Sequence, residues 1–188
     1  MSFLLSDMNF YSVDLSYIEA LYAQDHEVYR NIIDSNYERK PYIGILTHIN
    51  GRDYLIPLTS PKIKHVKWHY KTKTSFLIYE TIDRSLLSTH DIFKVIPGST
   101  DVNKILSVID IKKMIPVKHG IYTYIDISME QNLQYKSLLT KEYQFIKAIR
   151  REIVESASAI YNKLLNGELI KFGCNFLLLE SICDSYTI

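Results

Sequence analysis

The dipeptide Asn50-Gly51 is the feature of this sequence that most limits its fold. It separates two runs rich in β-branched and aromatic residues, Tyr42 to Ile49 and Tyr54 to Ile56. Asn-Gly is the preferred centre of a two-residue hairpin loop, because both central residues of that loop have a positive φ. The two runs are therefore predicted to pair as antiparallel neighbours in one sheet.

Strand and helix patterns surround this hairpin. Asp14 is suited to cap a first helix, and Ser128 to Gln131 fits a capping box at the start of a long helix that Gly167 would end. Asn175 is suited to cap a last helix, Phe176 to Cys183. These patterns predict an α+β fold: a strongly curved antiparallel sheet with flanking helices and a long helix in the C-terminal third. The other predicted strands cover residues 8–13, 75–79, 91–96, 105–111 and 121–127.

The bulk composition fits a single globular domain over residues 1–188. The chain is 47% hydrophobic and has a formal net charge of +1, and its apolar runs are too short for a signal peptide or a membrane span. Cys174 and Cys183 do not make a disulfide framework, and we expect two buried free thiols. A cytoplasmic protein without a membrane partner is therefore expected.

Positive charge and aromatic rings are concentrated after the hairpin, although the whole chain is nearly neutral. Residues 56–74 contain five lysines, two histidines, one tryptophan and one tyrosine, and residues 54–79 contain no Asp or Glu. Lysines contact phosphates while flat rings stack on unpaired bases, which favours single-stranded or loop RNA over duplex DNA. The alternative is a solvated loop whose rings belong to the core. The predicted RNA-binding residues are Lys64, His65, Lys67, Trp68 and Tyr70, with Lys112 and Lys113 from a later segment.

The tetrapeptide Thr59-Ser60-Pro61-Lys62 is the best candidate for chemistry. Pro61 cannot continue a central ladder, so the chain must turn there and leave two hydroxyls and backbone N–H groups at a sheet end. Such short donors can fix phosphate oxygens, while Lys62 supplies the compensating charge. An ordinary Ser/Thr-Pro turn with a solvated lysine would have the same sequence.

Several enzyme classes lack their motifs in this chain. There is no obvious paired-carboxylate site for two metal ions, no P-loop, no dinucleotide fingerprint and no nucleophile elbow, although a Ser-His-Asp hydrolase stays open. RNA cleavage without a metal fits better, because the substrate's own 2′-OH attacks the adjacent phosphate. The protein then only aligns it and stabilises negative charge. We expect no cofactor and no metal; His65 and His69 are candidates for proton transfer.

Six segments occur in order along nearly the whole chain: residues 8–11, 40–45, 54–62, 111–116, 144–146 and 174–180. Together they resemble the endoribonuclease toxins of type III toxin–antitoxin systems, the ToxN/AbiQ-like family, and Leu58 to Lys62 is the most specific piece. The resemblance implies a partial barrel with a MazF-like toxin core and added helices. It also implies metal-independent cleavage of cellular or phage RNA, leaving 2′,3′-cyclic phosphate and 5′-OH ends. Its implied partner is a repeated RNA pseudoknot antitoxin in a closed protein–RNA assembly, and its implied roles are plasmid maintenance and abortive infection against phage.

The resemblance assigns roles by position. Thr59 and Ser60 would hold the scissile phosphate, and Lys62 would support it electrostatically. Lys40 would stabilise charge or protonate the leaving group. Tyr37 would be the site tyrosine, although its spacing is one residue shorter than the family pattern, which leaves Tyr42 as the alternative.

Two regions fall outside the resemblance. Residues 1–7 precede it and are expected to be an N-terminal extension. Residues 82–104 match poorly, and a longer connection is favoured there over an insertion that shapes RNA specificity. Two other functions also stay open: an RNA-binding module without catalysis, and a toxin on a related barrel that acts on a protein.

Overall fold

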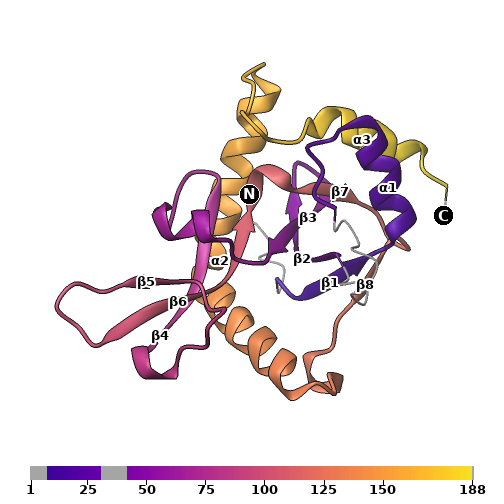
Figure 1. The fold of residues 1–188 in the computed structure, drawn as a ribbon. Coiled ribbons are helices and arrows are strands. Elements are labelled where there is room, and N and C mark those ends of the chain that lie inside the picture. The colour runs from indigo at the N-terminus through magenta and orange to yellow at the C-terminus, as the bar shows by residue number, and fades with distance from the viewer. Residues whose placement is uncertain (1–7, 31–41, 188) are drawn as a thin grey trace.

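The computed structural model describes residues 8–30 and 42–187, which Figure 1 shows in colour. The expected extension at residues 1–7 and two candidate site residues, Tyr37 and Lys40, lie outside the described residues. The strands are β1 (Phe10–Val13), β2 (Tyr42–Ile49), β3 (Arg52–Thr59), β4 (Ser75–Asp83), β5 (Phe93–Val95), β6 (Asp101–Asp110), β7 (Ile115–Val117) and β8 (Tyr122–Tyr124). The helices are α1 (Leu15–Gln24), α2 (Leu133–Leu165) and α3 (Phe176–Ser185).

The eight described strands form one antiparallel sheet whose main order is β4-β6-β3-β2-β1-β8. β3 is its centre: β2 lies along one side, and β7 and β6 share the other. β7 pairs with residues 53–55, and β6 pairs with only the last two residues of β3, at Leu58↔Ile109 and Thr59↔Val108. The pairing partner of β3 therefore changes from β7 to β6 just before the predicted turn. In Figure 1, β4, β5 and β6 project from the rest of the sheet. The predicted fold class, a curved antiparallel sheet with a long C-terminal helix, is confirmed.

The predicted hairpin is confirmed by its loop geometry. Asn50 has φ 50° and Gly51 has φ 81°, as a two-residue hairpin loop requires. A second glycine, Gly44, is needed where β2 meets β3. A Cβ at this position would lie 2.0 Å from Cδ2 of Leu55 and 2.5 Å from the carbonyl oxygen of Ile56. Only glycine therefore allows the two strands to approach this closely.

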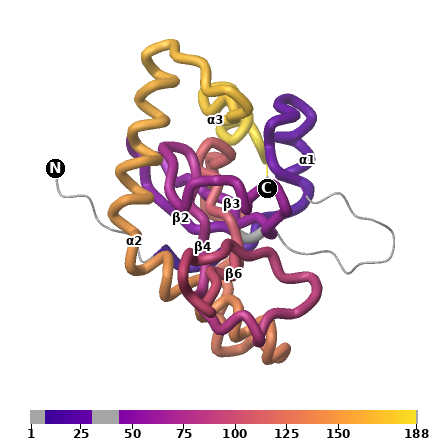
Figure 2. Tube along the Cα trace, turned by 60° about the vertical axis from the view of Figure 1, so that its left-hand side comes forward, coloured from indigo at the N-terminus to yellow at the C-terminus, as the bar shows by residue number. Residues whose placement is uncertain are grey.

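Most apolar side chains gather in one large core between the sheet and the helices. α1 and α3 lie side by side at one end of the molecule, while α2 runs its full length (Figures 1 and 2). A second, small core is formed by Leu77 of β4 with Ile105 and Val108 of β6. Cys174 and Cys183 are both free and buried, as predicted. No helix in residues 8–30 and 42–187 is both long and apolar enough to cross a membrane.

The predicted capping box before α2 is wrong. The cap is Asn132, whose side chain accepts a hydrogen bond from the backbone N–H of Tyr135 at 3.0 Å. Ser128 instead lies in a short 3₁₀ turn, where its own N–H donates to Asp126 at 2.8 Å. Because Asp126 closes that earlier turn, the chain becomes helical only after Asn132. The predicted caps Asp14 and Asn175, and Gly167 with φ 80° beyond α2, are confirmed.

Candidate functional site

The turn after β3 lies at the predicted place, at an end of the sheet. Thr59 is half-buried and is the last residue of β3, where it pairs with Val108 of β6. Ser60 and Lys62 follow it and are exposed. Two hydroxyls and one ammonium group are therefore available within four residues, where the chain has just left its ladder.

His65 holds this turn in place from inside. It belongs to the 3₁₀ helix Ile63–Lys67, and its Nδ1 accepts a hydrogen bond from the backbone N–H of Lys62 at 2.9 Å. The N–H of His65 in turn donates to the Lys62 carbonyl at 2.8 Å. The side chain is 4% exposed, so burial lowers its pKa, and the charges of Lys64 and Lys62 lower it further. The structure thus places this predicted RNA-binding residue where a neutral ring positions Lys62.

The lysines around the turn divide into two groups. Lys62, Lys64 and Lys67 are exposed, and none of them makes an ion pair within the described part of the chain. Lys71 and Lys113, by contrast, are paired with Glu152 and Glu27. Unpaired ammonium groups remain free to neutralise phosphates. Three exposed lysines without an ion pair in the described ranges therefore lie in residues 62–67, directly after the two hydroxyls, and Lys73 is a fourth further along the segment.

The two predicted stacking rings lie on the small core. Trp68 and Tyr70 are half-buried and pack against Leu77, Ile105 and Val108. The Tyr70 hydroxyl also accepts a hydrogen bond from Asn103 at 2.7 Å. The Lys64 ammonium lies 5.5 Å from the centre of the Trp68 ring. The rings therefore serve the core in part, which was the alternative interpretation of this segment.

A second basic and aromatic group, which the sequence analysis missed, lies around Phe172. This ring is 61% exposed, and the residue has φ 56°, which is unusual for a bulky side chain. The ammonium groups of Lys171 and Lys112 lie 5.1 Å and 5.9 Å from its centre. The predicted role of Lys112 in RNA binding stays a prediction. Its ammonium group lies beside an exposed aromatic ring. The sequence signal for this group was the adjacent pair Lys171-Phe172, which again places a basic residue beside an aromatic one.

Asp110 links the two basic groups. It is the last residue of β6, two positions after the partner of Thr59. Burial raises the pKa of its carboxyl, while the charges of Lys112, Lys113 and Lys64 oppose that rise. Lys64 and Lys112 therefore lie within electrostatic reach of the same carboxyl.

A cavity of about 310 Å³ borders the turn at Pro61. Its walls come from β4, β6, the first turns of α2 and the loop before β5. Within the described ranges, no three His, Cys, Asp or Glu side chains are grouped as metal ligands would be. The described part of the site thus consists of hydroxyls, lysines and this neighbouring cavity.

Comparisons with known proteins were made for the sequence and for the fold. The family model described as "Toxin ToxN, type III toxin-antitoxin system" matches residues 9–184. "Endoribonuclease ToxN" of Pectobacterium atrosepticum is 35% identical over 174 residues, which cover 92% of this chain and 90% of that protein.

Two solved structures are similar over nearly their whole length. One, described as "A processed non-coding RNA regulates a bacterial antiviral system", has a TM-score of 0.72 and 29% identity, covering 95% of this chain and 99% of that chain. The other has a TM-score of 0.66 and 25% identity, covering 95% and 96%. It is described as showing selective toxin inhibition by a non-coding RNA pseudoknot.

Proposed function

This chain belongs to the ToxN toxin family of type III toxin–antitoxin systems, and we propose that it cuts RNA at the turn formed by Thr59, Ser60 and Lys62. It is an endoribonuclease, like the relative from Pectobacterium atrosepticum. The observation that carries the proposed site is the meeting of two hydroxyls with unpaired lysines where β3 ends.

The reaction needs no added nucleophile. The 2′-OH of the RNA loses its proton and its oxygen bonds to the adjacent phosphorus, while the bond from phosphorus to the 5′ oxygen breaks and that oxygen gains a proton. The products are a 2′,3′-cyclic phosphate and a 5′-OH. Ser60 and Thr59 would donate hydrogen bonds to the non-bridging oxygens, whose charge grows in the transition state. Lys62, held by His65, would stabilise that charge.

Lys40 and Tyr37 precede β2 in the sequence, and their roles are proposed from the family match. Gly44 pairs with Pro57, and the same antiparallel register brings the start of β2 beside the end of β3. Tyr42 begins β2 and follows Lys40 by two residues in the sequence. Lys40 would act on the leaving group and Tyr37 on the phosphate or the 2′-OH.

The partner of this toxin is an RNA antitoxin, because type III systems are regulated by RNA. A repeated pseudoknot is the proposed form, as in the solved relative inhibited by a pseudoknot. The toxin and this RNA would form a closed assembly in the cytoplasm, with residues 1–188 as a single domain. The system would act in defence against phage by abortive infection, in keeping with the solved relative from a bacterial antiviral system. The basic surface at residues 62–67 would serve both the antitoxin and the target RNA.

Cleavage by purified protein in EDTA tests the chemistry. The wild-type protein should cut RNA and leave cyclic phosphate ends, while Ser60→Ala should lose about 100-fold or more in rate, as removal of one oxyanion donor does. Ser181→Ala is the control, because its hydroxyl is exposed on α3 and, among the residues that the structure describes, donates only to the Leu178 carbonyl of the same helix. Equal rates for Ser60→Ala and wild type, or a requirement for Mg²⁺, would contradict the mechanism. Tight RNA binding without any cleavage would point to the non-catalytic alternative.

A further inference from the structure

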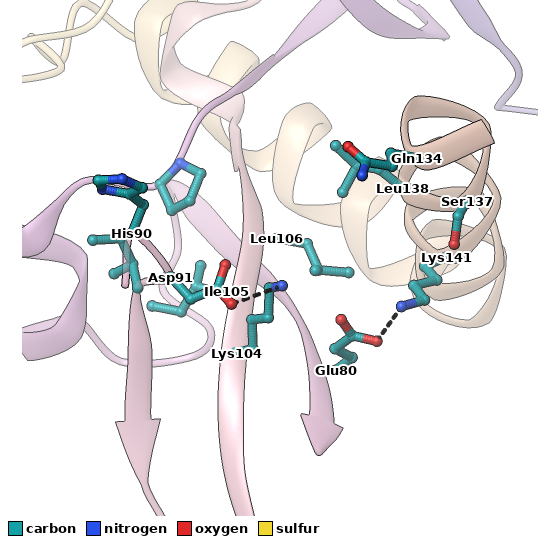
Figure 3. Close-up of a pocket in the computed structure, with 12 residues that line it drawn as sticks. Glu80, His90, Asp91, Lys104, Ile105, Leu106, Gln134, Ser137, Leu138 and Lys141 are labelled. Carbon is teal, nitrogen blue, oxygen red and sulfur yellow. Dashed lines mark ion pairs between the residues drawn. The ribbon is translucent and has the colours of Figure 1, made fainter. Parts of the chain in front are cut away.

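The cavity beside the turn has one wall from residues 82–104, the stretch that was expected to be a longer connection. Figure 3 shows His90 and Asp91 of this stretch on one side and Gln134 of α2 on the other, with Leu106 between them. Pro61 also lines the cavity. Pro61 directly follows Ser60, and consecutive Cα atoms are about 3.8 Å apart, so the cavity begins beside Ser60. This stretch therefore also lines a cavity beside the turn.

The charges in this cavity cancel. Lys104 pairs with Asp91 at 3.0 Å, and Lys141 pairs with Glu80 at 2.5 Å. The cavity therefore has no unpaired lysine to hold a phosphate, in contrast to the surface at residues 62–67. A neutral ligand suits it better, because a charged one would have to compete with two pairs that are already made.

The remaining lining suits a flat, polar-edged ring. Leu106, Leu138 and Ile92 provide apolar contacts, as the faces of a heterocycle require. The side chains of His90 and Gln134 are exposed, and neither makes a hydrogen bond within the described residues. An imidazole and an amide offer both donors and acceptors, which is what the edge of a nucleobase needs.

We propose that this cavity binds one unpaired nucleobase of the RNA, in the nucleotide next to the scissile phosphate, and so sets which sequence is cut. The proposal rests on the proposed function of the Thr59–Lys62 turn. The exposed lysines of residues 62–67 hold the RNA backbone, and the cavity recognises one base through His90 and Gln134. His90 belongs to residues 82–104, so this segment contributes to the choice of the RNA sequence that is cut.

Mapping of 5′-OH ends in a random RNA pool tests this inference. In the double variant His90→Ala, Gln134→Ala, the preference for one base beside the cut should fall by about fivefold or more, the loss expected for a base contact. Both side chains are exposed, so the variant should fold normally, which circular dichroism and thermal melting would check. Gln144→Ala is the matched control, since Gln144 is exposed on the same helix outside the cavity and should leave the preference unchanged.

An abasic substitution gives a second readout. A substrate that lacks the preferred base should be cut at least fivefold more slowly by the wild-type protein, whereas the double variant should cut both substrates alike. Unchanged preferences in the folded double variant, or equal wild-type rates on both substrates, would overturn the base-binding cavity. Failure of the catalytic proposal would look different: Ser60→Ala would then cut normally, whatever the base preference.

Discussion

Replacement of Glu142 by glutamine should stabilise the protein, and the gain should depend on pH. Glu142 is 5% exposed, on the face of α2 that packs against the sheet, and it makes no ion pair within the described residues. Burial raises the pKa of its carboxyl from 4.5 to about 7, and the nearby Ser107 hydroxyl only partly opposes the rise. Between these two pKa values, Glu142 therefore stays protonated in the folded protein but is ionised in the unfolded chain.

The size and sign of the effect follow from the two pKa values. Between about pH 4.5 and 7 the folded state binds more protons at this site than the unfolded state, so the free energy of unfolding falls as pH rises. One pKa unit corresponds to about 1.4 kcal/mol, so the rise to about 7 costs about 3 kcal/mol at pH 8. Glutamine keeps the shape of the protonated carboxyl and does not ionise. The variant should match the wild type near pH 4.5 and exceed it by about 3 kcal/mol at pH 8.

Urea unfolding at pH 5, 6, 7 and 8 measures this difference. With a slope of about 1–3 kcal/mol per molar urea, the midpoint of Glu142→Gln should lie about 1–3 M above that of the wild type at pH 8. Glu155→Gln is the control, because the same change is made at an exposed position of the same helix and should shift the midpoint little at any pH. A gap of equal size at pH 5 and pH 8, or a less stable glutamine variant at pH 8, would refute the reasoning.

Three further changes test the packing and the RNA surface. Gly44→Ala should lower the free energy of unfolding by about 2 kcal/mol or more, because the new methyl group would overlap β3, and a drop in melting temperature checks this. Joint replacement of Lys62, Lys64 and Lys67 by glutamine should reduce the slope of log affinity against log salt by about 2, since each phosphate contact on a single strand contributes about 0.7. Fluorescence anisotropy with labelled RNA measures that slope, and an unchanged slope would place the RNA elsewhere. Phe172→Ala should weaken binding to single-stranded RNA by roughly fivefold to 100-fold if a base stacks there, whereas Phe172→Tyr should retain it.

Features that depend on near neighbours could be predicted from the sequence. The Asn50-Gly51 loop and the caps Asp14 and Asn175 are each fixed by the backbone preferences of a few adjacent residues, and all three are present in the structure. The capping box at Ser128 failed for a local reason as well. The Ser128 N–H that Gln131 would bind in a capping box donates instead to Asp126, two residues before it.

Features that depend on distant partners could not be predicted. β7 is three residues long with Pro116 at its centre, and it is recognised as a strand by its pairing with residues 53–55 of β3. The role of His65 depends on its burial, which converts a surface candidate into a support for Lys62. The cavity joins Pro61 to residues of α2 more than 70 positions later, and no local pattern in the sequence indicates that meeting.

The hairpin that limits the fold also builds the candidate site. The register Gly44↔Pro57, set by the Asn50-Gly51 loop, brings the start of β2 and the end of β3 to the same end of the sheet. A slip of one residue would turn every side chain of β3 to the opposite face. Thr59 would then no longer stand opposite Val108, where β3 passes from β7 to β6 and the turn begins. The close approach of the strands at Gly44 resists such a slip, because any residue with a Cβ opposite Pro57 would collide with β3. The loop and Gly44 therefore hold the proposed catalytic turn in place, although neither provides a chemical group for the reaction.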